Sequence, residues 1–185
     1  MALSYSSSVR TGDIVEREFA SLCSTHNWLA SKITAGFGSN IPLLVANGKK
    51  IKAPDILLRK GTIEVAVEVK SKEPFCGTYP IDIHRVDYAY EWSKVTQYPL
   101  FIVIKNKPYE EEDPKAFSVC SINKLYQNHI MTDPNSTDRN GRPCPTYIYE
   151  DSLFVPFEEH FLAGSISTKT DVSFYFDNDG EELLI

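Results

Sequence analysis

An alternating stretch between Thr62 and Lys70 constrains the fold more than any other part of the chain. Every second position holds a branched aliphatic residue, namely Ile63, Val65, Val67 and Val69. The positions between them hold Glu64, Ala66, Glu68 and Lys70. Side chains point to alternate faces of a β-strand, so this period of two predicts a strand with one apolar face. Glu68 and Lys70 then share the other face.

A β-hairpin is predicted from residues 51–70. The composition of residues 51–58 favours a first strand, and Lys60-Gly61 favours a tight turn into the second strand. The hairpin therefore brings two chain segments with charged residues side by side.

The register of this hairpin decides which charged side chains meet. With a two-residue turn at Lys60-Gly61, Arg59 pairs with Thr62. The same register puts Asp55 opposite Ala66, with Glu68 diagonally adjacent on the same face. A slip of one residue would carry Asp55 to the opposite face, so the predicted meeting of the two carboxylates depends on the turn.

Helices are predicted on both sides of the hairpin from apolar residues at three- and four-residue spacing. The first covers residues 11–27, with its buried stripe at Ile14, Val15, Phe19, Leu22 and Cys23. The second covers residues 82–96, with its core side at Ile83, Val86, Tyr90 and either Trp92 or Val95. After Pro99, the continuous apolar run 100–104 predicts a strand that is buried on both faces.

The order of helix, strands, helix and strand predicts an α/β fold with a central mixed sheet flanked by helices. Further strands are expected at residues 117–122, 146–149 and 172–176, and a strand running into a loop at 33–42. Loops are expected at 106–115 and 131–145, a loose tail at residues 1–10, and either a helix or a loop at 123–130. A length of 185 residues and an apolar fraction of 42% suit one domain with a real core. We expect a single domain over 1–185, with its core at 11–104 and a C-terminal extension at 105–185.

The four cysteines are widely scattered and lack the spacing of a zinc site. They favour reduced thiols, and the sequence lacks both a membrane-spanning apolar run and the pattern of a secretory leader. A cytoplasmic protein without a membrane partner is therefore expected.

Charge is unevenly distributed along the chain, although the formal net charge is -6. Residues 45–72 carry seven basic and three acidic groups, a balance of +4. Residues 145–185 carry nine acidic groups and one basic group, a balance of -8. A positive patch on an acidic body favours contact with a phosphate backbone at one place. A chance imbalance over solvated surfaces is the alternative interpretation.

The hairpin suggests a metal-dependent chemistry. Asp55 and Glu68 would repel each other unless a cation lay between them, and Mg²⁺ prefers such hard oxygen ligands. Lys70 could then stabilise charge on a transferring phosphoryl group or favour deprotonation of an attacking water. Phosphodiester hydrolysis is the reaction that suits this set. The alternative is that Glu68 and Lys70 form an ordinary charged pair on an exposed strand.

Pro54-Asp55, followed after twelve residues by Glu68-Val69-Lys70, resembles the signature of the PD-(D/E)XK nucleases. Glu16-Arg17-Glu18 resembles the helical glutamate before that signature, especially in Holliday-junction-resolvase-like members. The similar order of elements covers residues 11–104 and implies a restriction-endonuclease-like core.

The resemblance also implies roles for individual residues. Asp55, Glu68 and the carbonyl of Val69 would hold Mg²⁺, with Mn²⁺ as a plausible substitute, and Lys70 would be the catalytic lysine. Glu16 would complete the site by holding a water or a second metal, with Glu18 as the alternative. The basic side chains expected to contact nucleic acid are Lys52, Lys72 and Arg85.

The function implied is that of a Mg²⁺-dependent DNA endonuclease, and the resemblance implies products with a 5′-phosphate. Its biological setting is left open between junction resolution or repair and restriction or a mobile element. Junction resolution would require a homodimer to cut two strands symmetrically. The alternative class is a catalytically inactive nuclease-fold module that binds nucleic acid or a protein partner.

Overall fold

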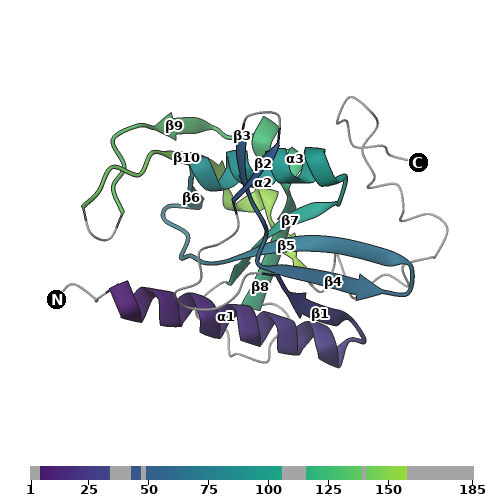
Figure 1. Cartoon of the computed structure of the whole chain (residues 1–185). Helices are drawn as coiled ribbons and strands as arrows, with labels where there is room; N and C mark the ends of the chain where they lie inside the picture. Colours follow the sequence, from purple (N-terminus) through teal and green to yellow (C-terminus); the bar gives the residue numbers. More distant parts are fainter. Residues whose placement is uncertain (1–4, 34–42, 47–48, 106–115, 139–140, 158–185) are drawn as a thin grey trace.

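The computed structural model describes residues 5–33, 43–46, 49–105, 116–138 and 141–157. At its centre lies a six-stranded sheet in the order β1-β4-β5-β7-β8-β11 (Figure 1). Its strands are β1 (Leu29–Lys32), β4 (Ile56–Lys60), β5 (Ile63–Ser71), β7 (Leu100–Lys105), β8 (Phe117–Ser121) and β11 (Val155–Pro156). β5 and β7 run parallel and the other neighbouring pairs run antiparallel, so the sheet is mixed.

Helices cover both faces of this sheet (Figure 1). One face packs against α1 (Tyr5–Thr25), and the other packs against α2 (Ile83–Thr96) and α3 (Ile122–Gln127). The predicted α/β class, with a central mixed sheet flanked by helices, is therefore confirmed.

The alternation along β5 assigns its side chains to these two layers. Val65, Val67 and Val69 belong to the core under α1, whereas Ala66 belongs to the core under α2. By the period of two, Glu68 and Lys70 lie on the α2 side of the sheet. The predicted strand and its division into two faces are confirmed.

The first helix begins at Tyr5, so the prediction of a loose tail over residues 1–10 is wrong for residues 5–10. Asp13 therefore lies within the helix, where its carboxylate pairs with Arg17 and Lys32, both at 2.6 Å. The helix ends at Thr25, and Asn27 has the left-handed backbone (φ 65°) common after a helix.

The buried stripe of α1 is correct at four of its five predicted positions, which are Val15, Phe19, Leu22 and Cys23. Ile14 was also expected there, but its side chain is 53% exposed. It lies on the adjoining face of the helix, because the stripe that meets β5 is centred on Phe19.

The predicted strand 51–58 is broken in two. β3 (Lys49–Lys52) pairs with β2 (Leu43–Ala46) in a separate two-stranded sheet, and β4 starts at Ile56. Pro54 lies at the break, where it supplies no N–H to a sheet ladder. Asp55 therefore lies in a short connection between the two-stranded sheet and the six-stranded sheet.

The hairpin turn lies at Gly61-Thr62 rather than at Lys60-Gly61, and Gly61 adopts a positive φ of 62°. Lys60 pairs with Ile63, and Ile56 pairs with Val67. Continued by one residue, this register brings Asp55 opposite Glu68 instead of Ala66. The predicted register is wrong by two residues, but an even shift leaves Asp55 on the face that was expected.

The second helix begins at Ile83, with Asp82 accepting a hydrogen bond from the His84 N–H as its N-cap. Its buried residues are Val86, Ala89, Trp92 and Ser93. Val95 was an alternative core position, but its side chain is 45% exposed. After the helix, β7 is buried along its whole length, as predicted.

A three-stranded sheet lies beside the end of α2 that begins at Ile83, in the order β6-β10-β9 (Figure 1). Its strands are β6 (Thr78–Asp82), β10 (Thr146–Glu150) and β9 (Met131–Asp133), and a short 3-10 helix, η2, covers Asp151–Leu153. β6 was not predicted, and β9 falls in a segment predicted as a loop. The expected loop at 106–115, most of 33–42 and the expected strand at 172–176 lie outside the described residues. Within the described part of the chain, no helix has the length and apolar character needed to cross a membrane.

Candidate active site

Asp55 is held against β5 by its backbone and by its side chain. Its N–H donates to the Val67 carbonyl at 3.1 Å, and its own carbonyl accepts from the Ile33 N–H at 3.0 Å. The Oδ2 atom of its carboxylate accepts a hydrogen bond from the Val69 N–H at 2.9 Å. The Asp55 carboxylate therefore accepts a β5 backbone hydrogen bond directly before β4 begins. Asp55 is only 5% exposed.

Glu68 and Lys70 meet Asp55 on the α2 side of β5. The Lys70 Nζ atom lies 2.5 Å from Glu68 Oε1, 3.8 Å from Asp55 Oδ2 and 3.3 Å from the Val69 carbonyl oxygen. Glu68 is 3% exposed. The structure thus brings together the four predicted residues of the hairpin, which are Asp55, Glu68, Val69 and Lys70.

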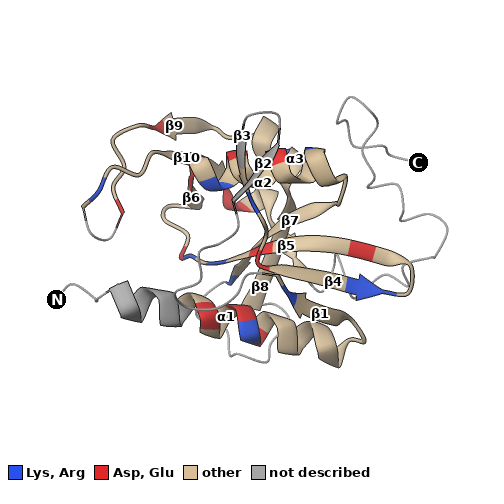
Figure 2. Cartoon of the chain, in the orientation of Figure 1, with Lys and Arg blue, Asp and Glu red and all other residues tan. Residues whose placement is uncertain are grey.

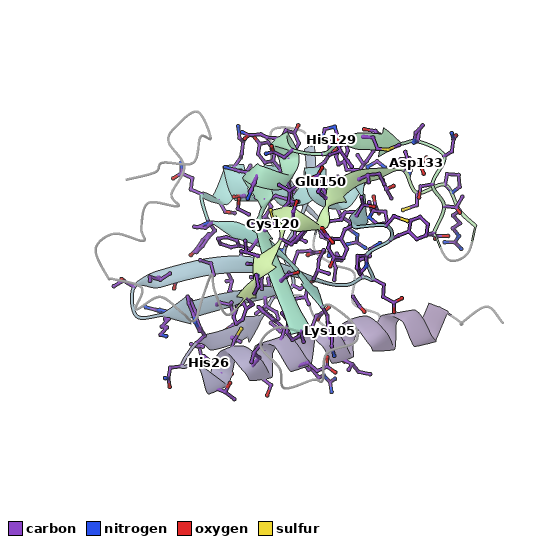
Figure 3. All side chains as sticks on the ribbon, turned by 180° about the vertical axis from the view of Figure 1, so that it is seen from behind. His26, Lys105, Cys120, His129, Asp133 and Glu150 are labelled. Carbon is purple, nitrogen blue, oxygen red and sulfur yellow. The ribbon has the colours of Figure 1, made fainter. Side chains whose placement is uncertain are left out.

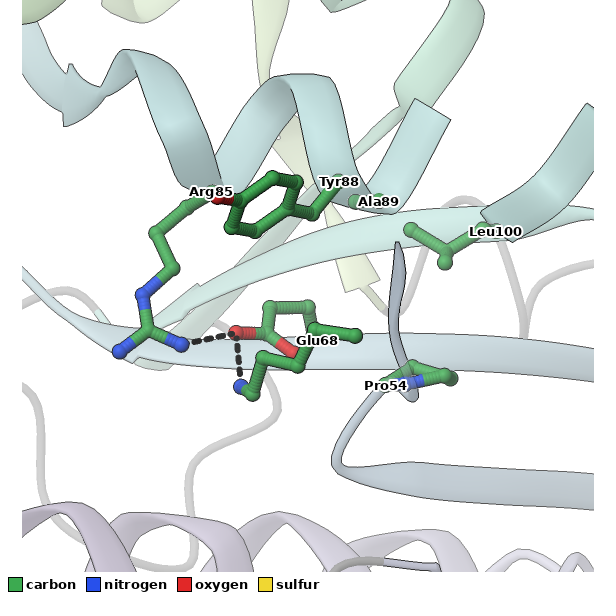
Figure 4. A pocket seen from close by; sticks show the side chains of 7 residues that line it. Pro54, Glu68, Arg85, Tyr88, Ala89 and Leu100 are labelled. Carbon is green, nitrogen blue, oxygen red and sulfur yellow. Dashed lines mark hydrogen bonds and ion pairs between the residues drawn. The ribbon is translucent and has the colours of Figure 1, made fainter. Parts of the chain in front are cut away.

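Two further cations approach the same carboxylates. The Lys52 Nζ atom lies 3.0 Å from Glu68 Oε1 and 3.6 Å from Asp55 Oδ1. A guanidinium nitrogen of Arg85 lies 3.9 Å from Glu68 Oε1 (Figure 4). Lys52 and Arg85 were predicted to contact nucleic acid, and both lie against Glu68 here. Acidic residues of β5 and of the segment before β4 lie next to each other in Figure 2.

The pKa values of the two carboxyl groups move in opposite directions. Burial, together with the charge of Glu68, raises the pKa of Asp55 to about 6, although Lys70 and Lys52 oppose the rise. Burial would also raise the pKa of Glu68, but Lys70, Lys52 and Arg85 together outweigh it and lower that pKa to about 2. Burial opposes the charged form of Lys70 too, yet Glu68 and Asp55 raise its pKa above the usual value. Lys70 is therefore protonated at neutral pH.

The lowered pKa of Glu68 makes a prediction for folding stability. A carboxyl group with a folded-state pKa of about 2 and an ordinary value of 4.5 stabilises the fold above pH 4.5. That contribution, on the order of 3 kcal/mol, is lost as the pH falls from 4.5 towards 2. Glu68→Gln should be less stable than the parent at pH 7 in EDTA, and the gap should narrow on acidification. Urea unfolding from pH 2.5 to 7 measures the difference in unfolding free energy between the two proteins. A difference that does not change with pH contradicts the prediction.

Glu16 and Glu18, the two candidate helical glutamates, pair with different lysines. Glu16 pairs with Lys32 at 2.8 Å, and its charge contributes to the raised pKa of Asp55. Glu18 instead pairs with Lys105, which lies at the end of β7 beside α1 (Figure 3). Of the two glutamates, Glu16 is thus the one whose charge reaches Asp55, but Lys32 holds its carboxylate.

The donor set at the hairpin fits a hard divalent cation. Oxygens of Asp55, Glu68 and the Val69 carbonyl converge on the space where the ammonium groups of Lys70 and Lys52 lie. Among the described residues, however, no group of three His, Cys, Asp or Glu side chains gathers closely enough to hold a metal. A cation bound here would rely on two carboxylates, a backbone carbonyl and water.

A pocket of about 370 Å³ lies beside Lys70 and Arg85, the cations that contact Glu68. Lys70 and Arg85 line it on the side of the site, and Lys72, the third predicted nucleic-acid contact, lines it as well. Ser136, Thr137 and Thr146, which come from the segment around β9 and β10, also line it, as do Asp82 and Asp138. The sequence contains no motif that would have placed these hydroxyl residues beside the hairpin.

Comparison with known proteins bears on the fold. No protein-family model matches the sequence, and no curated protein matches it. Among solved structures, the chain is similar to Hjc, a Holliday junction resolvase from the archaeal hyperthermophile Archaeoglobus fulgidus. The match has a TM-score of 0.51 and 12% sequence identity, and it covers 80% of this chain and 98% of that one. The chain therefore shares the overall fold of that resolvase.

Proposed function

We propose that the protein is a Mg²⁺-dependent deoxyribonuclease that hydrolyses phosphodiester bonds within a DNA strand. The observation that carries this proposal is the convergence of two buried carboxylates and a protonated lysine at the start of β4 and on β5. The resolvase-like fold supports it, because that fold is shared with an enzyme that acts on DNA junctions.

Each residue of the cluster has a part in the proposed reaction. Asp55, Glu68 and the Val69 carbonyl would hold Mg²⁺, or Mn²⁺ in its place. When bound, the cation supplies charge stabilisation and a water of lowered pKa. Lys70 acts as a positive charge beside the scissile phosphate rather than as a base, because its raised pKa keeps it protonated.

Glu16 has an outer part in this proposal. Its carboxylate would hold a water or a second cation only after Lys32 releases it, because the two are paired at 2.8 Å. Glu18 is the weaker alternative, since its carboxylate pairs with Lys105.

DNA is the proposed partner, and we propose that it passes along the basic residues of the adjoining pocket. Lys72 and Arg85 line that pocket together with Lys70, so a phosphate backbone that passes them would approach the carboxylates. A homodimer is proposed only in connection with branched substrates, because two symmetric cuts require two sites. We also propose a cytoplasmic location, since Cys23, Cys76, Cys120 and Cys144 form no disulfide among the described residues and burial raises the pKa of Cys23 to about 12.

A closed circular DNA tests the proposed activity directly. Incubation with Mg²⁺ should convert the supercoiled circle to nicked and linear forms, and EDTA should prevent the conversion. An agarose gel separates the supercoiled, nicked and linear forms. Degradation of linear DNA with the circle left intact would show exonuclease action instead, and inactivity on linear, circular, single-stranded and branched DNA would refute the proposal.

One observation favours the alternative of a non-catalytic binding module. Lys52, Lys70 and Arg85 already surround the two carboxylates, so the cluster is compensated without any metal. Calorimetric titration with Mg²⁺ separates the two functions: binding that is lost in Asp55→Ala supports the nuclease, and absence of binding supports the module.

A further inference from the structure

Lys52 occupies a special position in the cluster. Its ammonium group lies between the two carboxylates, 3.0 Å from Glu68 Oε1 and 3.6 Å from Asp55 Oδ1. The other oxygen of Asp55, Oδ2, is engaged by the Val69 N–H and faces Lys70. Lys52 therefore bridges Glu68 Oε1 and the Asp55 oxygen that does not accept the Val69 hydrogen bond.

The charges of the cluster show what a cation must overcome. With both carboxylates ionised, Asp55 and Glu68 contribute two negative charges against three positive charges from Lys52, Lys70 and Arg85. A divalent cation added to this arrangement would raise the sum from +1 to +3. Like charges a few ångströms apart in a buried site repel strongly, so one cationic side chain has to leave.

Of the two lysines that contact both carboxylates, Lys52 is the side chain that can leave at the lower cost. Its backbone is anchored, because the preceding Ile51 is fully buried against α2 and Pro54 follows closely. Its long, flexible stem can swing out while the strand stays in place. Lys70, by contrast, also contacts the Val69 carbonyl, and Arg85 touches Glu68 only at 3.9 Å and is half-exposed already.

We propose that Lys52 is an internal counter-cation that holds the two carboxylates together without metal, and that metal binding expels it toward the DNA backbone. The inference rests on the proposed function, since it assumes that a divalent cation binds at Asp55 and Glu68. In this exchange Lys52 pairs with the two carboxylates when metal is absent and with a DNA phosphate when metal is bound. Metal binding and DNA binding are thereby coupled, because the ammonium that the metal displaces becomes available to a phosphate.

The first test measures Mg²⁺ affinity without DNA. Lys52→Met should bind Mg²⁺ at least about fivefold more tightly than the parent, because a positive charge about 4 Å from the cation has been removed. Lys94→Met is the matched control, since it removes the same charge from the exposed last turn of α2. Calorimetry reads the affinities, and Lys52→Gln, which keeps a hydrogen-bond donor, replaces the Met variant if that one does not fold.

The second test measures DNA affinity against salt. Ca²⁺, which binds the same kind of oxygen ligands, is used, and the recovered DNA is checked on a gel for cleavage. In EDTA, the parent and Lys52→Met should show equal salt slopes, because Lys52 is held by the carboxylates. In Ca²⁺, the parent slope should be steeper by about one phosphate contact, and the variant slope should lack that increment.

The outcomes separate this inference from the proposed function. Tighter Mg²⁺ binding by Lys52→Met, with Lys94→Met unchanged, supports the exchange. Equal or weaker binding by Lys52→Met, while the parent binds Mg²⁺, overturns the exchange and leaves the nuclease proposal standing. If neither protein binds Mg²⁺, both proposals fall. A salt-slope increment that persists in the variant overturns the delivery of Lys52 to DNA.

Discussion

Lys70→Met is expected to reduce the rate of DNA cleavage by about 10²- to 10⁴-fold, the range typical for removing one well-placed charge-stabilising group. The reason is geometric, because the Lys70 ammonium lies within 4 Å of both carboxylates. Loss of a like charge should at the same time leave Mg²⁺ binding intact or strengthen it.

Cleavage of a labelled substrate and Mg²⁺ calorimetry on the same preparation measure the two effects of Lys70→Met. The matched control is Lys124→Met, which removes an exposed lysine from α3. A variant that cuts DNA at the parental rate would show that Lys70 is only a structural counter-charge for Glu68.

Asp55→Asn is expected to abolish Mg²⁺-dependent cleavage and to stabilise the metal-free fold. The pKa of Asp55 is raised from 3.8 to about 6, so its contribution to stability is present below pH 3.8 and lost as the pH rises through 6. An amide stays neutral, and its oxygen can still accept from the Val69 N–H. The gain at pH 7 should be on the order of 3 kcal/mol.

Urea unfolding in EDTA tests this gain at two pH values. At pH 7 the Asp55→Asn variant should unfold at a higher urea concentration than the parent, and near pH 3.5 the difference should disappear. Addition of Mg²⁺ should stabilise the parent and leave the variant unchanged. A variant that is less stable at pH 7 would show that the Asp55 carboxylate is not held at an energetic cost.

The opposite signs expected for Asp55 and Glu68 follow from their neighbours. Lys70 and Lys52 lie 2.5 and 3.0 Å from Glu68 but 3.8 and 3.6 Å from Asp55, so at Asp55 burial and the charge of Glu68 outweigh them. The ionised form that the site disfavours is thus mainly that of Asp55. This is the group that a bound cation would relieve.

Much of this site could be predicted from the sequence because it depends on local periodicity. The alternation from Ile63 to Lys70 defined β5, its two faces and the shared side of Glu68 and Lys70. The turn was misplaced, since Lys60-Gly61 and Gly61-Thr62 are both compatible with a tight turn around one glycine. The resulting error of two residues preserved the face of Asp55, so the predicted meeting survived.

Features that depend on distant contacts could not be predicted. Nothing local to Lys52 indicates that its ammonium bridges two carboxylates, because its position depends on the break at Pro54 and the anchoring of Ile51 under α2. The pairing of Glu16 with Lys32 likewise depends on how α1 lies across the edge of the sheet. β6 is short and contains Pro80, β9 has only three residues, and both strands are held by pairing with β10.

Glu68 lies on β5 and Asp55 directly precedes β4, within the six-stranded sheet, while the β6-β10-β9 sheet forms a separate arm beside them. Lengthening or reshaping that arm would alter which DNA geometries reach the reactive centre without disturbing the atoms that perform the chemistry. In the proposed nuclease, substrate choice and bond cleavage would thus belong to parts of the chain that can change independently.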